Sequence, residues 1–515
     1  MTWDNSAITI ATFLPAVGAV VIALVPKTRD RMVRGLGIFF TGAALVVGIA
    51  MLFSFDFRAG AVMQFRLDTS WIPAINARYH VGIDGISLPL FELTLLLTFL
   101  CAIYSWRVVP SPGKTKGFLA LVLLLETGMA GTFVALDLVL FFIFWELVLV
   151  PMYFLIAVWG SSNREYAAIK FFLYTLFGSV FMLLAFLAMY FSSHVGATGA
   201  HTFDILELQR FAAGGGFTHD FQMVAFIGVF LGFAIKVPMW PFHTWLPDAH
   251  TEAPTVGSVL LAGIMLKLGA YGFIRIALPI LPDAARAWAP WIGLLAAIAI
   301  VYAALACLAQ RDLKRLIAFS SVGHMGFVML GIATLTTIGI NAAIFGMVAH
   351  GIITGMLFFE VGSIYDRYHT RQIADIGGGL MQKLPYLGGI LAFTAIASLG
   401  LPGLAGFWGE VMALLSSFQP AGGLSVSWFR AFMIAGGVGT IITAGYFLWM
   451  LQRIDLGVQP DRWKGEAIAD VSTIEWVSWV PLLLGIFVLG LFPRIIFGVT
   501  NEAVTGLTHL IGLSG

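Results

Sequence analysis

The stretch that decides the fold is Val224–Pro254, which reads VAFIGVFLGFAIKVPMWPFHTWLPDAHTEAP. It begins as an apolar run typical of a membrane helix, reaches Lys236, and then meets Pro238 and Pro241. Proline lacks a backbone donor and clashes with the preceding turn, so these residues predict a break in the helix. A charge beside such a break is tolerated in lipid only where it faces protein or a water-filled cavity. The stretch therefore predicts a discontinuous membrane helix with a functional ionisable group at Lys236.

Composition extends this prediction to the whole chain. Of the 515 residues, 59% are hydrophobic and 11% are charged, and the formal net charge is +1. Such values indicate a polytopic membrane protein and predict no nucleic-acid partner. Two cysteines, Cys101 and Cys307, are too few for a disulfide framework or a metal cluster. The first apolar run, 7–25, lacks the flanking signals of a signal peptide, so we expect it to be a retained helix.

Apolar runs of about 20 residues, enough to cross about 30 Å of hydrocarbon, recur roughly fourteen times along the chain. We therefore expect an all-α polytopic membrane protein with about 14 transmembrane helices. The expected segments are 6–26, 35–55, 86–106, 117–136, 138–158, 166–192, 222–246, 256–281, 287–309, 315–335, 340–365, 386–418, 428–452 and 475–497. Odd-numbered loops hold roughly twice as many lysines and arginines as even-numbered loops, which places odd loops in the cytoplasm and both termini on the periplasmic side.

The spacing of the helix breaks predicts an internal repeat. From Gly117 to the break at Pro238 is about 120 residues, and from Ala287 to a second break at Pro402, in LGLPGLAGF, is about 115 residues. Because each unit spans five helices, the second starts from the opposite side of the membrane, a pattern typical of transporters with a midplane site. We expect four parts: residues 1–116 with three helices, a five-helix repeat at 117–281, an inverted five-helix repeat at 287–452, and a final helix and tail at 475–515. Each repeat would form a half-channel.

Six ionisable residues interrupt the apolar runs near the middle of their segments. A lone charge in hydrocarbon costs several kcal/mol unless it is paired or neutralised, so each is a candidate functional group. We predict that they form a proton or cation relay, in which Lys236 is the counter-charge of Glu146. A desolvated lysine loses proton affinity and a nearby carboxylate restores it, so this pair could load and unload a proton. The six residues are Glu146, Lys236, Lys267, His324, His350 and Glu410. The alternative for each is a structural hydrogen bond between helices.

Other polar residues support weaker hypotheses. Glu92 and Glu126 lie within apolar runs as accessory or structural groups, and we expect Glu360 to reach the membrane interface. A metal site is a minor alternative for four residues after the first break, whose spacing matches no common ligand motif: His243, Asp248, His250 and Glu252. We expect this segment to be a loop that seals the broken helix, with no metal.

Four long motifs make a family resemblance specific. They are KVPMWPFHTWLPDAHTEAPTVGSVLLAGIMLKLGAYG, FWELVLVPMYFLIAVWG, RDLKRLIAFSSVGHMGF and SLGLPGLAGFWGE, with weaker support from GIDGISLPL at 82–90. Over about residues 80–500 the chain resembles the antiporter-like subunits of respiratory complex I, NADH:quinone oxidoreductase. Within that family it most resembles the bacterial M-type subunits, equivalent to the mitochondrially encoded chain four. The chain is too short for an L-type subunit, and it has Glu410 where N-type subunits carry lysine.

The resemblance implies roles for the buried charges. Glu146 and Lys236 would form the coupling pair, Lys267 would be central, and Glu410 would be the exit-side site. Protons would pass from cytoplasm to periplasm, driven by redox chemistry elsewhere in NADH:ubiquinone reductase. The sequence has no nucleotide loop, haem ligand pair or cysteine cluster, so NADH, FMN, iron–sulfur clusters and quinone are expected in other subunits.

The resemblance also implies partners and a location. The expected partners are L- and N-type antiporter-like neighbours, the remaining membrane-arm subunits and the lipid of a bacterial inner membrane. Two alternatives remain at this point: a subunit of a multi-chain sodium/proton antiporter, and a non-pumping scaffold of the membrane arm. A scaffold would need none of the buried charges. The sequence leaves open whether the transported ion is H⁺ or Na⁺.

Overall fold

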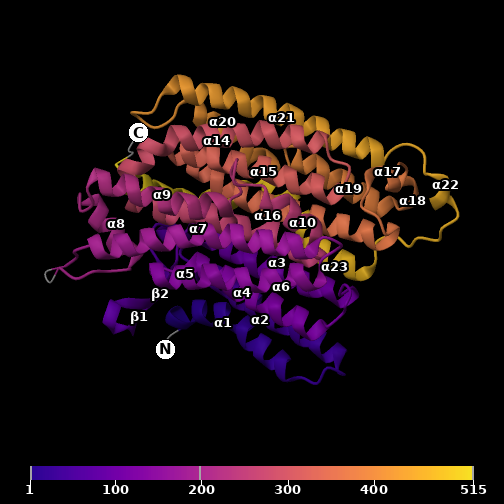
Figure 1. Cartoon of the computed structure of the whole chain (residues 1–515), viewed down its shortest axis with the longest axis horizontal. Coiled ribbons are helices and arrows are strands. Elements are labelled where there is room, and N and C mark those ends of the chain that lie inside the picture. Colours follow the sequence, from indigo (N-terminus) through magenta and orange to yellow (C-terminus); the bar gives the residue numbers. More distant parts are fainter. Residues whose placement is uncertain (1–2, 197–198, 513–515) are drawn as a thin grey trace.

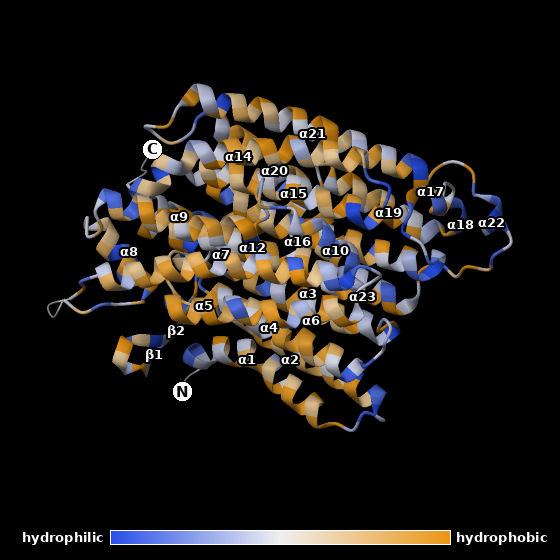
Figure 2. Ribbon diagram, in the orientation of Figure 1, coloured by the Kyte–Doolittle hydropathy of each residue, from blue (hydrophilic) through white to orange (hydrophobic). Residues whose placement is uncertain are grey.

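The computed structural model describes residues 3–196 and 199–512 of the chain. Within these residues, 13 helices are long and apolar enough to cross a membrane, and the shorter helix α19 begins a further, discontinuous segment. Together they account for the segments that the apolar runs predict, and the all-α membrane fold is confirmed. Hydrophobic residues fill the length of the bundle, while hydrophilic residues gather mainly in the connections at its two ends (Figure 2).

The first three long helices are α1 (Trp3–Leu24), α2 (Asp30–Ser54) and α3 (Leu88–Arg107). Between α2 and α3 lies a hairpin that the apolar pattern did not predict. It consists of the antiparallel strands β1 (Gln64–Ile72) and β2 (Ala77–Ile83), with the short turns η1 (Phe57–Ala59) and η2 (Pro73–Ile75). The hairpin, helix α8 (Ile205–Ala213) and both ends of the described chain lie at the same end of the bundle (Figure 1).

The next helices are α4 (Thr115–Val134), α5 (Leu138–Leu147), α6 (Leu149–Trp159) and α7 (Arg164–Ser192). The division predicted at Asp137 is confirmed, because its carboxylate caps α5 by accepting from the backbone N–H groups of Val139 and Leu140. One long span, 138–159, is interrupted at Val148. Pro151 lacks the N–H that would bond to the carbonyl of Leu147, which explains the interruption next to Glu146.

The first predicted break lies between α9 (His219–Lys236) and α10 (Trp245–Glu252). Because Pro238 has no N–H, the carbonyl of Ala234 accepts a hydrogen bond from Met239 N instead, at 2.9 Å. The indole Nε1 of Trp245 donates to the carbonyl of Ile235, also at 2.9 Å. The groups freed by the proline are thus satisfied within the protein, as the lipid environment requires.

The fully buried span after this break is not a uniform α-helix. It runs through α11 (Thr255–Leu260), η3 (Leu261–Met265), α12 (Leu266–Gly272), η4 (Phe273–Ala277) and α13 (Leu278–Ile280), where η3 and η4 are π-helical turns. The wider π-turn shifts the backbone hydrogen-bond register and is frequent at functional sites. Lys267 lies in the α-helical turn between the two, a feature that hydrophobic periodicity did not predict.

The second half contains α14 (Pro282–Leu308), α15 (Leu313–Ala333) and α16 (Thr337–Tyr368), followed by the short helices α17 (Ile373–Ile376) and α18 (Leu380–Lys383). The second predicted break separates α19 (Pro385–Ser398) from α20 (Ala405–Phe418). Gly400 and Gly403 flank Pro402 with φ angles of +84° and +94°, a left-handed conformation that favours glycine. Helices α19 and α20 run from the end that carries α17 and α18 toward the end that carries the termini, opposite to α9 and α10 (Figure 1).

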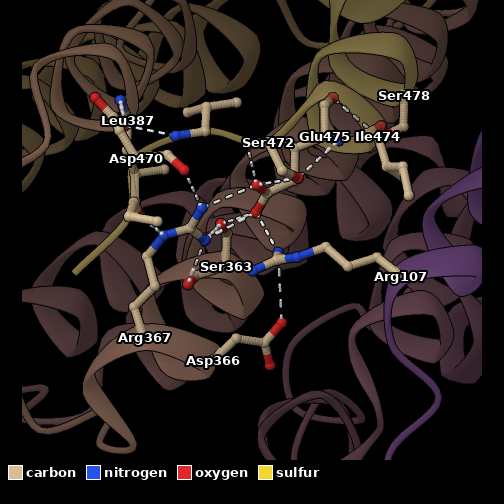
Figure 3. A network of polar contacts seen from close by, with 12 residues as sticks. Arg107, Ser363, Asp366, Arg367, Leu387, Asp470, Ser472, Ile474, Glu475 and Ser478 are labelled. Atoms are coloured by element: carbon tan, nitrogen blue, oxygen red, sulfur yellow. Dashed lines mark hydrogen bonds and ion pairs between the residues drawn. The ribbon is translucent and has the colours of Figure 1, made fainter. Parts of the chain in front are cut away.

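The chain ends with α21 (Val426–Ile454), α22 (Asp461–Lys464), α23 (Thr473–Leu491) and α24 (Arg494–Leu510). The last predicted span, 475–497, is therefore too long, and its end belongs to a separate helix. A buried ion cluster fastens α23 to α16 and α3 (Figure 3). Arg367 Nη1 and Nη2 donate to Glu475 Oε1 and Oε2 at 2.8 and 2.9 Å, and Arg107 and Ser363 also donate to Oε1.

Candidate functional site

Glu146 and Lys236 face the same region from α5 and α9. Lys236 is 2% exposed, and its ammonium group lies 5.0 Å from the ring centroid of Trp145, the residue before Glu146. The two charges interact electrostatically, but among the described side chains they form no ion pair within 4.0 Å. Glu146 Oε1 has no hydrogen-bond partner in the described part of the chain. The carboxylate therefore lies near its predicted counter-charge without pairing directly with it, and the hydroxyl of Ser179 also interacts with it.

Lys267 is fully buried, and the π-turn before it explains how its charge is accommodated. Its Nζ donates to the carbonyl of Ala262, which lies in that turn. Glycines bring its helix close to α9, because a Cβ at Gly269 would lie 2.7 Å from the carbonyl oxygen of Phe233. Lys267 is thus held close to the helix that carries Lys236, although no direct contact joins the two lysines.

The second contact of Lys267 is with a histidine of α16. Its Nζ lies 2.5 Å from Nδ1 of His350, a hydrogen-bond distance. If the ammonium donates, the imidazole must be neutral, and if His350 is protonated, Lys267 must be the neutral acceptor. The contact therefore holds one proton between two bases. His350 Nε2 has no partner among the described residues and lies on the side of a small cavity.

That cavity joins His350 to the remaining predicted residues. It has a volume of about 30 Å³ and is lined in part by His324, Ser398 and Glu410. The rings of His350 and His324 are 5.7 Å apart between centroids. Such a volume admits a water molecule where polar groups can bind it. A water there would connect the two histidines.

His324 is bonded on both sides of its ring. Nδ1 lies 2.8 Å from Glu410 Oε1, and Nε2 lies 3.1 Å from the hydroxyl of Ser398. Glu410 is 8% exposed, and its Oε2 has no partner among the described residues. The break between α19 and α20 places Glu410 one to two turns into α20, beside the glycines that open the backbone. Lys267, His350, His324 and Glu410 thus form one row of titratable groups.

Two buried residues near this row were not predicted as part of it. His250 of α10 is fully buried, neither ring nitrogen has a partner among the described residues, and the charges of Lys314 and Lys267 act on it. Lys314 of α15 is 5% exposed and donates to the carbonyl of Ala253. A buried position of His250 could have been suspected from its place in the helix-breaking motif.

The prediction for Glu360 is wrong. It does not reach the interface but is fully buried on α16, because α19 covers it and Thr394 donates to its Oε1 at 2.7 Å. The four residues of the minor metal alternative are not brought together, since Asp248 pairs with Lys170 at 2.7 Å and Glu252 accepts from Asn163 N at 2.9 Å. Among the described residues, only Asp68, His80 and Asp204 have metal-ligand spacing. Arg66 and Arg78 already donate to that group.

The discontinuous helices and the row of buried charges define the class: a polytopic ion-translocating membrane protein. Comparison with known proteins identifies the family. The family described as "NADH:quinone oxidoreductase/Mrp antiporter, TM" matches residues 135–443. The chain belongs to this family. It is 40% identical over 518 residues to the protein named NADH-quinone oxidoreductase subunit M of Rhodobacter capsulatus, an alignment that covers 98% of this chain and 97% of the relative. The predicted resemblance to M-type subunits is confirmed.

Solved structures agree with this assignment. A chain of the respiratory complex I from Thermus thermophilus matches with a TM-score of 0.85 and 28% identity, over 99% of this chain and 100% of that chain. A chain of the Mrp complex from Dietzia sp. DQ12-45-1b matches with a TM-score of 0.82 and 20% identity, over 100% of both chains. The second likeness concerns the fold alone.

Proposed function

We propose that this chain is a proton-translocating subunit of the membrane arm of an NADH:quinone oxidoreductase, with the redox chemistry in other subunits. The single observation that carries the proposal is the contact of Lys267 Nζ with His350 Nδ1 at 2.5 Å, continued by His324 and Glu410. Buried titratable groups in one connected row can pass protons, whereas a scaffold could pack the same space with apolar side chains at lower cost.

The proposed relay begins at Glu146 and Lys236. When Glu146 moves away, desolvation drives the proton off Lys236, and when it returns, the charge pair restores proton affinity. A released proton reaches Lys267 across the close α9–α12 contact, with His250 near the path. His350 and His324 then carry it to Glu410. The two half-channels correspond to residues 117–281 and 287–452, and the opposite directions of the two discontinuous helices support an inverted repeat.

The proposed orientation follows from loop charge. The end of the bundle that carries α17, α18 and α22 holds Arg453, Arg462 and Lys464, and we place it in the cytoplasm of a bacterial cell. Both termini then lie on the periplasmic side of the inner membrane. The proposed neighbours are L- and N-type antiporter-like subunits and other membrane-arm subunits, and NADH, FMN, iron–sulfur clusters and quinone would be held by the rest of the complex.

The test uses the whole complex in sealed vesicles. NADH oxidation should drive proton uptake by vesicles in which this chain is intact, and Lys236→Ala should remove most of that uptake while the complex still assembles on native gels. Normal uptake with Lys236→Ala would contradict the proposal. The same preparation should also be measured with and without Na⁺, because a strict Na⁺ requirement together with sodium uptake would favour the sodium/proton antiporter alternative.

The sodium/proton antiporter alternative is supported by the similarity of this fold to a chain of the Mrp complex. The 40% identity to subunit M of Rhodobacter capsulatus, over nearly the full length, favours the redox-driven complex instead. Purification of the native complex separates them, because an antiporter would copurify without NADH-oxidising subunits.

A further inference from the structure

A second set of buried polar groups lies outside the proposed relay, one helical turn further toward the start of α19. Its central group is Glu360 of α16, which is fully buried. Thr394 of α19 donates to Glu360 Oε1 at 2.7 Å, while Oε2 has no hydrogen-bond partner among the described residues. A buried carboxyl with one oxygen unpaired is costly as an anion, so it favours a bound proton or cation.

Asp455 supplies a second carboxyl to this set. It follows the last residue of α21, is 1% exposed, and neither of its carboxylate oxygens has a partner in the described part of the chain. Its backbone is fixed by hydrogen bonds to Leu451 O and from Met381 N. Gly388 of α19 makes the space, because a Cβ there would lie 2.6 Å from Asp455 Oδ1.

The two carboxyls are close enough for the charge of Asp455 to act on Glu360. Like charges in a buried site cannot both ionise without a large cost, so the pair retains a proton. Burial raises the pKa of Asp455 to about 7. The cation on the neighbouring short helix, Lys383, is engaged elsewhere, since its Nζ donates to the carbonyl of Trp463 at 3.1 Å.

Helix α19 connects this pair to the relay. Thr394 and Ser398 lie one helical turn apart, about 6 Å along the axis, and both are buried. Ser398 lies 3.1 Å from His324 Nε2 and lines the small cavity beside His350. A single water can bridge two hydroxyls at this separation.

The end of α21, which Asp455 follows, lies beside α17, α18 and α22, at the end of the bundle opposite the termini (Figure 1).

We propose that Glu360 and Asp455 form a proton-accepting pair that supplies His324 and Glu410 along α19, separately from Glu146 and Lys236. A proton from water adds to an oxygen of Asp455 and passes to Glu360. The hydroxyl of Thr394 accepts it and releases its own proton toward Ser398, whose hydroxyl does the same toward His324 Nε2. The pair thus returns to the singly protonated state from which it took up the proton, each hydroxyl is unchanged and His324 gains the proton, so the step is balanced. This inference rests on the proposed function.

The experiment compares variants of the assembled complex in vesicles, with NADH-driven proton uptake as the readout. Glu360→Gln, Asp455→Asn and the isosteric Thr394→Val should each lower uptake about tenfold or more, and Glu360→Asp should recover part of it. The matched control is Glu466→Gln, an exposed acid between α22 and α23, which should behave as wild type. Infrared difference spectra during turnover should contain a protonated-carboxyl band that Glu360→Gln removes.

Wild-type uptake in Glu360→Gln and Thr394→Val would overturn the inference. Sodium uptake that depends on Glu360 would also overturn it, because the pair would then be a cation site. Glu146→Gln and Lys236→Ala are measured in parallel: if they abolish uptake while Glu360→Gln does not, only this inference fails, and if they too are silent, the proposed function fails.

Discussion

The Nζ of Lys267 lies 2.5 Å from Nδ1 of His350, and both side chains are buried in the middle of the bundle. These nitrogens come from α12 and α16, and the π-turn η3 that precedes α12 packs on α16, where a Cβ at Gly351 would lie 2.9 Å from the carbonyl oxygen of Gly263. Because two nitrogen bases at this distance share one proton, the contact can pass a proton in either direction with little movement of heavy atoms.

This contact predicts strong coupling between the two residues. Lys267→Met and His350→Leu should each reduce NADH-driven proton uptake by about 100-fold, and the double variant should be no worse than either single one. The measurement is a double-mutant cycle on proton uptake in vesicles, with assembly checked on native gels. Additive losses would mean that the two residues act independently.

Glu146→Gln is expected to leave assembly intact and to remove most proton uptake. The amide keeps the shape of the side chain but carries no charge that could move toward Lys236. An exposed acid of α7 gives the matched control, since Glu165→Gln should have no effect. A normal uptake rate in Glu146→Gln would exclude the coupling-pair role.

At Lys236, alanine should disable transport, and arginine should rescue it poorly. Arginine retains its proton at every accessible pH, so it can hold the charge near Trp145 but cannot release a proton. Proton uptake and NADH oxidation are measured for both variants. Full activity in Lys236→Arg would show that this position needs only a fixed charge.

At Glu410, protonation rather than size should matter. Glu410→Asp should keep substantial uptake because aspartate titrates in a similar range, and the nearly isosteric Glu410→Gln should lose most of it. The hydrogen bond of His324 Nδ1 gives an independent readout. Its partner stays a carboxylate in Glu410→Asp and becomes a neutral amide only in Glu410→Gln. Equal uptake in the two variants would leave Glu410 as a structural carboxylate.

The cluster around Glu475 should contribute stability rather than transport. Arg367→Lys keeps the charge but loses the two-pronged contact with Glu475, so it should cost part of the about 3–5 kcal/mol that removal of a whole partner of a buried ion pair costs. We expect a lower thermal stability of the assembled complex, with an unchanged ratio of protons taken up to NADH oxidised. A changed ratio in complexes that remain assembled would place the cluster in the transport path.

The sequence by itself determined the membrane class, both helix breaks and the places of the six candidate titratable residues, of which Lys236, Lys267, His350 and Glu410 are buried. These features are local: apolar runs of bilayer length, prolines at Pro238 and Pro402, and charges within such runs can be seen one segment at a time. The order of the candidate groups along the chain also suggested a relay. It did not reveal which groups touch.

Only the tertiary structure decided the contacts. Lys267 and His350 are 83 residues apart, and their meeting depends on how two helices pack and on π-turns that hydrophobic periodicity cannot signal. For the same reason Glu360 was predicted to reach the membrane interface, although α19 covers it. In a chain that is apolar nearly throughout, each helix can bury almost any face, so interhelical packing alone assigns every polar group its partner.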